Sequence, residues 1–326
     1  MPIIELQHIS KEFRIKEQTT GFTNNLKRFF KPQYKTVQAV QDLSFSVEPG
    51  EMVGFIGENG AGKSTTIKMM TGILRPTSGE VTVNGRRPYE NRKQNAMQIG
   101  VIFGQRSRLM TDLSMEDSFR LYKEIYRVPD ALYQHNVSYF VELLDMQDFF
   151  TQPVRQLSLG QRMKAELAVT LLHDPSVLFL DEPTIGLDVL AKSKIRDFLV
   201  QANRQKGTTT ILTSHDMKDL DVVCHRIVMI SKGRLLFDGP IARFRERFGN
   251  ETMLNITFAA TDVHIDDPRL RVAVDEGVKK QILFHASEIS LPEAISYFTQ
   301  RFELVDLTVK EPDIEEIVRG VYSQQA

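Results

Sequence analysis

The sequence has no tryptophan and only one cysteine, Cys224, among its 326 residues. A single cysteine excludes a disulfide framework and a metal site built from several cysteines, and it is typical of a reducing compartment such as the cytosol. No stretch approaches the roughly 20 apolar residues that a membrane-spanning helix needs. Residues 1–8 also lack the charged-then-apolar pattern of a signal peptide. We therefore expect a cytoplasmic protein in which any membrane role depends on a separate partner chain.

An excess of charge of one sign is missing as well. Lysine and arginine number 41 and aspartate and glutamate 42, which gives a net charge of −1. A globally basic nucleic-acid binder is therefore not expected, and we predict no nucleic-acid partner. Charged residues make up 25% and hydrophobic residues 41% of the chain, values that are ordinary for a globular protein with a sizeable core.

Short apolar runs alternate with helical patterns through most of the chain. We expect strands at 52–56, 100–103, 177–180, 209–213 and 227–230, and helices at 63–71, 160–172 and 190–204. Several of the strand runs are apolar throughout, as is usual for strands with both faces covered. This alternation predicts an α/β fold with a largely parallel sheet.

The pattern changes near residues 248–250. Beyond this point, β-like runs at 254–258, 281–285 and 305–309 surround one helical pattern at 291–302, and a short helix follows. We therefore predict two domains, a large α/β domain at 1–245 and a small α+β domain at 250–326.

Residues 57–64 match the phosphate-loop pattern G-x-x-x-x-G-K-[ST], between the strand at 52–56 and the next helix. Glycines let such a loop turn its backbone N–H groups inward around phosphates, and the helix N-terminus adds a partial positive charge. Lys63 then reaches the β- and γ-phosphates, and the Ser64 hydroxyl binds Mg²⁺. The candidate nucleotide-binding residues are Gly57, Glu58, Asn59, Gly60, Ala61, Gly62, Lys63, Ser64 and Thr65.

The loop has two other possible interpretations. A glycine-rich turn that only caps a helix is disfavoured by the strand before the loop and the helix after it. A dinucleotide-binding loop is excluded because Thr65 stands where the last glycine of G-x-G-x-x-G would be.

Two acids, Asp181 and Glu182, end the apolar run at 177–180. The C-terminal ends of parallel strands face the nucleotide crevice in such folds. Asp181 is therefore a candidate Mg²⁺ ligand, and Glu182 is a candidate base that accepts a proton from the attacking water. A simple helix cap is the alternative, and the phosphate loop upstream favours the catalytic interpretation.

The segment 157–161, Leu-Ser-Leu-Gly-Gln, precedes this strand. Ser158 and Gln161 have the spacing of a capping box, and the free N–H groups of a helix N-terminus suit a second anion. The segment resembles the signature loop, usually L-S-G-G-Q, of the ATP-binding cassette (ABC) family. It matches at four of five positions, and Leu159 replaces the first glycine, so a different backbone approach is expected there.

The ABC resemblance covers about residues 1–245. It implies a P-loop NTPase cassette with a RecA-like core, an antiparallel β subdomain and a helical subdomain at 106–157. It also implies two cassettes that dimerise head to tail, as a homodimer or pseudo-dimer, with ATP between the phosphate loop of one and the signature of the other. Ser158 and Gly160 then contact the γ-phosphate across the interface, and Gln161 also binds the nucleotide.

Three more positions match the family pattern. The resemblance implies that Gln105 senses the γ-phosphate, Mg²⁺ and water, that Asp188 lies at the dimer contact, and that His215 holds the γ-phosphate and the attacking water. Taken singly, they have ordinary alternatives as a surface amide, a helix cap and a strand-end histidine. The implied catalytic residues are Glu182, His215 and Gln105, and the implied Mg²⁺ ligands are Ser64, Gln105 and Asp181.

The family also places an aromatic ring under the adenine, and Phe13 is the best match. Tyr34 competes because the segment 14–35 between them looks inserted, and a core role for Phe13 is a third possibility. The segment contains six cationic residues and only one acidic residue, Glu17. The cationic residues are Arg14, Lys16, Lys27, Arg28, Lys31 and Lys35. Contact with an anionic membrane surface or with a membrane subunit is one interpretation, and a solvated loop is the other.

The resemblance implies an ATPase, and the single cassette without a long coiled-coil insertion favours transport. The stretches 101–107, 181–188 and 213–217 look like those of drug exporters with a separately encoded membrane subunit. We therefore expect an exporter subunit at the cytoplasmic face of the cell membrane, powering an integral membrane permease through ATP-driven dimer closure. A non-transport ABC ATPase in signalling or in a cytosolic assembly is the alternative.

Overall fold

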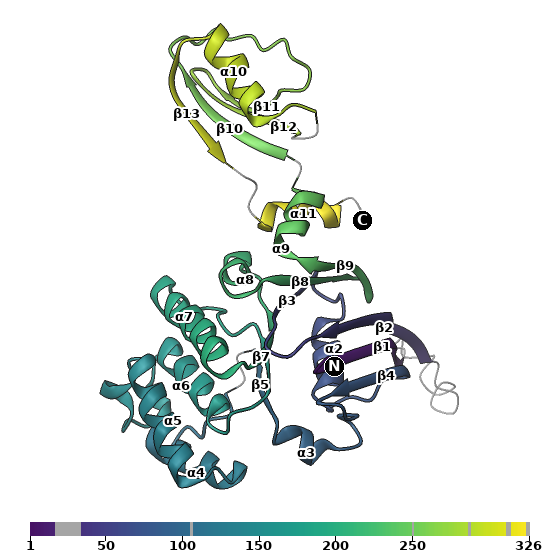
Figure 1. Cartoon of the computed structure of the whole chain (residues 1–326), viewed down its shortest axis with the longest axis vertical. Coiled ribbons are helices and arrows are strands. Elements are labelled where there is room, and N and C mark those ends of the chain that lie inside the picture. Colours follow the sequence, from purple (N-terminus) through teal and green to yellow (C-terminus); the bar gives the residue numbers. More distant parts are fainter. Residues whose placement is uncertain (17–33, 105–106, 250, 286–287, 311–313, 324–326) are drawn as a thin grey trace, which may run out of the picture. The chain divides into compact units, whose positions relative to one another are not determined.

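The computed structural model describes residues 1–16, 34–104, 107–249, 251–285, 288–310 and 314–323. The chain divides into two compact units, Met1–Gly239 and Pro240–Ala326 (Figure 1). This division falls before helix α9, Ile241–Phe248, whereas the sequence analysis placed 241–245 in the first domain. Helix α9 belongs to the second unit because it packs against α11, Ile314–Ser323. No described helix has both the length and the apolar character needed to cross a membrane.

A six-stranded sheet runs through the first unit in the order β5-β6-β7-β3-β8-β9. Its strands are β3 (Met52–Gly57), β5 (Ile99–Phe103), β6 (Val177–Asp181), β7 (Thr209–Thr213), β8 (Arg226–Ser231) and β9 (Arg234–Pro240). The pairs from β5 to β8 are parallel, and the five predicted strands are all present. Strand β7 is buried throughout, because both faces of the sheet are covered. The carboxyl ends of β3, β6 and β7 therefore meet at one edge of the sheet.

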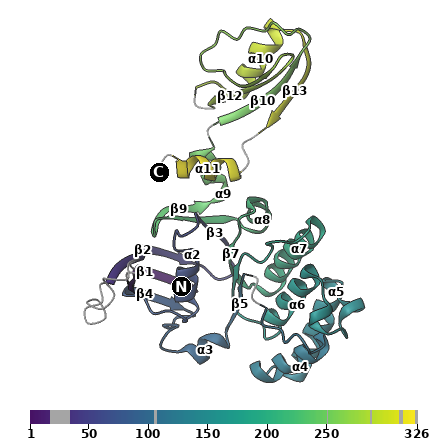
Figure 2. The same ribbon diagram turned by 180° about the vertical axis from the view of Figure 1, so that it is seen from behind.

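Helices cover this sheet from two sides (Figures 1 and 2). Helix α2, Lys63–Met70, lies on one side together with an antiparallel sheet, and α6, Leu159–Leu171, and α7, Val189–Lys206, lie on the other. Helix α8, Met217–Val223, packs against α7. The other helices among the described residues of this unit are α3 (Arg92–Ala96), α4 (Met115–Tyr126), α5 (Asp130–Leu143) and two 3-10 turns (Gln147–Phe149 and Val154–Gln156). The predicted subdomain at 106–157 is thus helical in its described part.

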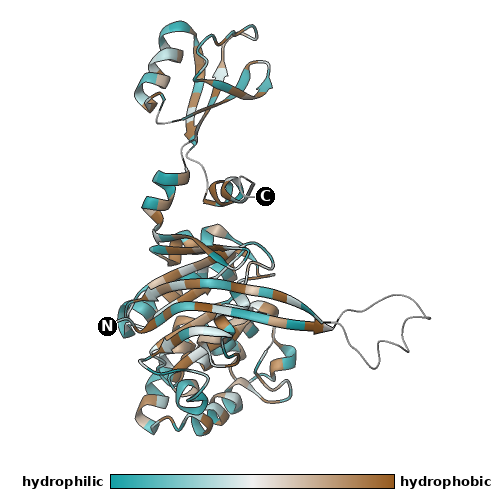
Figure 3. Cartoon of the chain, turned by 90° about the vertical axis from the view of Figure 1, so that its right-hand side faces the viewer, coloured by the Kyte–Doolittle hydropathy of each residue, from teal (hydrophilic) through white to brown (hydrophobic). Residues whose placement is uncertain are grey.

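The antiparallel sheet has the order β2-β1-β4. Its strands are β1 (Ile4–Lys16), β2 (Tyr34–Val47) and β4 (Ser78–Val83). Apolar and polar residues alternate along the β1–β2 hairpin (Figure 3), and the buried ones join the central sheet in one hydrophobic core. The outer part of the hairpin is exposed, as at Ile15. Residues 14–16 and 34–35 of the predicted basic segment extend these strands, while 17–33 lie outside the described residues.

The second unit holds a four-stranded antiparallel sheet in the order β11-β12-β10-β13. Its elements besides α9 and α11 are β10 (Glu251–Phe258), β11 (Arg271–Glu276), β12 (Lys279–His285), α10 (Leu291–Arg301) and β13 (Leu304–Lys310). One sheet face packs on α10 through residues such as Phe258, Phe284 and Phe298. Strand β11 was not predicted; its only strand signal is the pair Val272 and Val274, and every residue of this strand is exposed.

Candidate functional site

The phosphate-loop motif lies between β3 and α2, in the predicted strand–loop–helix context. Gly62 has φ 106°, and a Cβ atom there would lie 2.5 Å from the carbonyl oxygen of Ala39. Only glycine fits this position, since both the backbone conformation and the space exclude a side chain. Helix α2 has no side-chain cap at its N-terminus. Its first N–H groups are therefore available to an anion, which the helix dipole also favours.

Lys63 folds back over the loop. Its Nζ donates hydrogen bonds to the carbonyl oxygens of Gly57 and Glu58, the latter at 3.2 Å. Burial lowers the pKa of Lys63 below its ordinary value, and the carboxylates of Glu182, Asp181 and Glu58 act in the opposite direction. The loop thus holds a partly desolvated cation where phosphates would bind.

Asp181 links the end of β6 to its neighbours. Its Oδ2 accepts a hydrogen bond from the Ser64 hydroxyl at 3.1 Å, and its Oδ1 accepts one from the Thr213 hydroxyl at 2.7 Å. Thr213 is the register partner of Asp181 on β7. A hydroxyl and a carboxylate side by side are the hard oxygen ligands that Mg²⁺ takes, with phosphates and water completing its shell. The described residues contain no cluster of three or more His, Cys, Asp or Glu side chains that could hold a metal.

The predicted base and the predicted γ-phosphate ligand also meet. His215 Nε2 lies 2.7 Å from Glu182 Oε1. Glu182 has φ 57°, a left-handed conformation that is uncommon for a residue with a side chain. Its N–H donates to both the carbonyl and the hydroxyl oxygen of Thr213, each at 3.1 Å, which holds this backbone in place.

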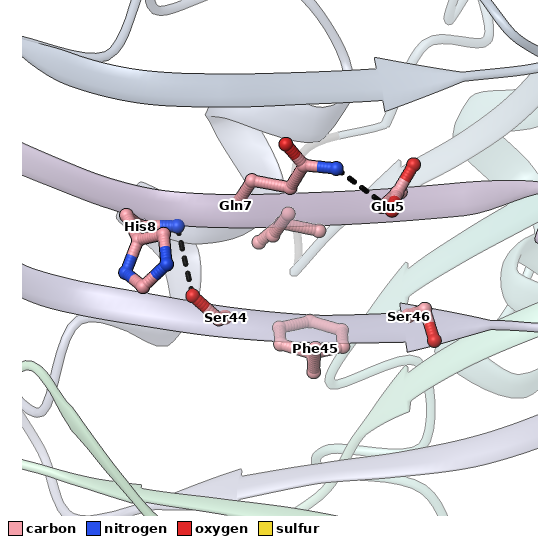
Figure 4. A pocket seen from close by; sticks show the side chains of 7 residues that line it. Glu5, Gln7, His8, Ser44, Phe45 and Ser46 are labelled. Carbon is pink, nitrogen blue, oxygen red and sulfur yellow. Dashed lines mark hydrogen bonds between the residues drawn. The ribbon is translucent and has the colours of Figure 1, made fainter.

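The Glu182–His215 pair borders a cavity of about 110 Å³ at the carboxyl edge of the sheet. Residues after both strands line it, and the full set is Glu182, Thr184, Ile185, Gly186, Lys192, Ser214, His215 and Asp216. A larger cavity of about 350 Å³ lies on the β1–β2 hairpin, lined by Glu5, His8, Phe45 and their neighbours (Figure 4). None of the predicted site residues lines this second cavity.

The capping box predicted at the signature segment is present. The Ser158 hydroxyl accepts a hydrogen bond from the Gln161 N–H, and the Gln161 side chain accepts one from the Ser158 N–H at 2.9 Å. Leu159 is the first residue of α6 and does not have a positive φ. The residue is 40% exposed, so replacing glycine here leaves the helix start intact and adds an apolar side chain to the surface.

The signature segment lies beside Asp188 rather than beside the phosphate loop. A Cβ atom on Gly160 would lie 3.2 Å from that of Ala191, whose N–H donates to Asp188 at the N-cap of α7. Helices α6 and α2 lie on opposite sides of the central sheet (Figures 1 and 2). Within one chain, the structure therefore separates the predicted γ-phosphate contacts of Ser158 and Gly160 from Lys63.

Three remaining predictions concern Phe13, Tyr34 and Gln105. Phe13 lies on β1, half-buried and outside the hydrophobic core, with Lys11 Nζ 5.3 Å from its ring centre. Tyr34 begins β2 and is exposed. Gln105 lies outside the described residues. Sequence reasoning missed Thr213, whose only signal was its place at the end of the strand before His215.

Comparison with known proteins decides the family. The model of a family described as ABC transporter matches residues 40–185. The ABC transporter ATP-binding protein NatA of Bacillus subtilis (strain 168) is 32% identical over 69% of this chain and 92% of its own length. The chain belongs to the ABC transporter family. It is the ATP-binding subunit of an ABC transporter, and it is an ATPase.

Other relatives of this ABC cassette match different shares of the chain. The "Probable multidrug ABC transporter ATP-binding protein YbhF" of Escherichia coli (strain K12) is 33% identical over 65% of this chain. The matched region covers 36% of that protein's own length. The "Methionine import ATP-binding protein MetN 2" of Enterococcus faecalis (strain ATCC 700802 / V583) is 26% identical over 98% of the chain and 90% of its own length. A solved ATP-binding subunit of an ABC transporter has a TM-score of 0.62 at 24% identity, over 76% of this chain and 93% of its own, which shows a shared fold.

Proposed function

We propose that this ABC cassette powers an exporter whose permease is a separate membrane chain. One observation carries the proposal. Lys63, Ser64, Asp181, Glu182 and His215 converge at one edge of the central sheet, while the signature segment lies elsewhere in the same chain. A second cassette is needed to bring a signature to this edge, and such ATP-driven pairing is a movement that a membrane partner can use.

The hydrolysis step is assigned to the convergent residues. Lys63 and the N–H groups at the start of α2 hold the β- and γ-phosphates. Ser64 and Asp181 would hold Mg²⁺, which neutralises phosphate charge when bound. Glu182 accepts a proton as the water oxygen bonds to the γ-phosphorus, and the bond to the ADP oxygen breaks. His215 lies against Glu182 and orients the water and the γ-phosphate, so that catalysis is mainly positioning.

The pairing of two cassettes is assigned to the signature segment at the start of α6 and to Asp188 beside it. Ser158, Gly160 and Gln161 at the start of α6 would contact the γ-phosphate bound to the second copy. The capping box uses the N–H groups of Ser158 and Gln161, so the N–H of Gly160 would be the backbone donor. Asp188, which lies beside them, would be at the contact between the copies. Phe13 or Tyr34 would stack on the adenine, and Gln105 would link the γ-phosphate to the permease.

The direction of transport is proposed from similarity. The stretches 101–107, 181–188 and 213–217 resemble drug exporters, and YbhF is named as a multidrug transporter subunit. One observation favours an importer as the second candidate, since the match to MetN 2, a methionine import protein, extends through the second unit. The basic segment 14–35 is proposed to contact the permease or an anionic membrane surface.

Purification of the transporter from membranes tests both parts of this proposal. We expect the tagged chain, recovered from detergent-solubilised membranes of its own organism, to carry an integral membrane protein in a fixed ratio. In vesicles with the cassettes outside, ATP should drive amphipathic dyes into the lumen. A chain that brings no membrane protein with it would overturn the proposal of a separate permease. Dependence on a solute-binding protein inside the lumen would instead support the importer.

A further inference from the structure

A buried carboxylate joins the two segments that carry the catalytic pair. Asp219 lies on α8, and its side chain is 1% exposed. Its Oδ2 accepts hydrogen bonds from the hydroxyls of Thr184 and Ser214, the latter at 3.2 Å. Thr184 follows Glu182 by two residues, and Ser214 directly precedes His215. One oxygen atom therefore holds together the chain after β6 and the chain after β7.

The charge of Asp219 is balanced from α7. Arg196 NH1 lies 3.6 Å from Asp219 Oδ1, and the Arg196 side chain is 17% exposed. A buried carboxylate is unfavourable unless hydrogen bonds and an opposite charge compensate it. Oδ2 of Asp219 has the hydrogen bonds, and Oδ1 has the nearby charge of Arg196 but no hydrogen bond among the described residues. Because neutral residues could fill the same space without this requirement, the carboxylate points to a need for geometry rather than for stability alone.

A second set of hydrogen bonds, at Asp216, also holds the segment around His215 in place. The N–H of Asp216 donates to the Ser214 hydroxyl at 3.0 Å, and Lys192 Nζ donates to Asp216 Oδ2 at 2.7 Å. Burial alone would raise the pKa of Asp216, but the hydrogen bond and charge of Lys192, the Lys218 N–H and the charge of Arg196 together hold this pKa below its ordinary value. His215 thus lies between two residues that hydrogen bonds fix to α7 and α8.

We propose that Asp219 is a positioning residue that sets the distance between Glu182 and His215. It acts through Thr184 and Ser214, and it does not touch the nucleotide. The proposal rests on the catalytic roles proposed for Glu182 and His215. Loss of the clamp would let the two segments move independently, and a displacement of about 1 Å at a reacting group can lower a rate by up to about a hundredfold.

Thr184→Val tests the clamp because valine keeps the shape of threonine and removes only the hydroxyl. We expect kcat for ATP hydrolysis to fall roughly tenfold while KM for ATP changes less than about twofold. Thr184→Ser restores the donor and should restore kcat. The matched control is Thr209→Val at the opposite end of β7, where a buried hydroxyl accepts a hydrogen bond from the Gly50 N–H at 2.8 Å. This control removes a comparable buried bond without changing the catalytic edge.

The outcomes separate this proposal from the proposed function. Equal kcat values in Thr184→Val and Thr209→Val, at matched thermal stability, would overturn the clamp. Should Thr184→Val fail to fold, Ser214→Ala removes the other donor and must give the same selective loss in kcat. Normal hydrolysis in Glu182→Gln would overturn the assignment of the base instead, whatever the threonine variants do.

Discussion

Glu182→Gln is expected to lower the ATP hydrolysis rate by about a thousandfold while the affinity for ATP stays within roughly threefold. A general base contributes about 10²–10⁴ to a rate, and a neutral amide cannot accept the proton of the attacking water. The contact with His215 survives, because the glutamine carbonyl occupies the place of Oε1, which lies 2.7 Å from His215 Nε2. The loss is therefore specific to proton transfer.

Phosphate release in a single turnover, together with binding of a fluorescent ATP analogue, measures the two quantities separately. Glu142→Gln is the matched control, since this glutamate is exposed on α5. It should leave both quantities at their original values. If Glu182→Gln released phosphate at the normal rate, Glu182 could not be the base, and the chemistry at the carboxyl edge would need another acceptor.

Lys63→Ala is expected to weaken ATP binding by about a hundredfold. Its ammonium is the cation held inside the phosphate loop, and a hydrogen bond between charged groups contributes about 1.5–3 kcal/mol. Lys63 is also partly desolvated, so its attraction for phosphate is less screened than that of a surface lysine. Removing it leaves the phosphate charge facing Asp181 and Glu182 with less compensation.

The matched control lies on the same helix. Lys68 is exposed in the last turn of α2, and Lys68→Ala removes an equal charge away from the loop. Titration of each variant with ATP at constant salt should show weaker binding only for Lys63→Ala. Thermal unfolding without ATP checks that both variants fold. Wild-type affinity in Lys63→Ala would show that the phosphates bind elsewhere.

Local features of this cassette could be predicted from the sequence. The parallel strands were found because several of them are unbroken apolar runs, as in β6, whose residues 177–180 are all apolar and buried. The phosphate loop was found because only glycine permits the conformation that Gly62 adopts. The Ser158–Gln161 capping box was found because both partners lie within one helical turn.

Features that depend on distant parts of the chain could not be predicted from the sequence. The contact of Glu182 with His215 joins residues that follow two different strands, and the resemblance gave them roles but no distance. Thr213 and Asp219 are ordinary residue types whose importance comes from their hydrogen-bond partners. Strand β11 was missed for a different reason, because two valines, Val272 and Val274, in a run of six residues are a weak strand signal.

The central claim is that the convergent edge is half of an ATP site that a second copy completes. The mass of Glu182→Gln in solution, measured by light scattering with and without Mg²⁺ and ATP, tests this claim directly. We predict the 37.3 kDa mass of a single chain without nucleotide and twice that mass with ATP. Adding Lys63→Ala should return the mass to that of a single chain. A single-chain mass under saturating ATP, with binding confirmed in the same sample, would contradict the account.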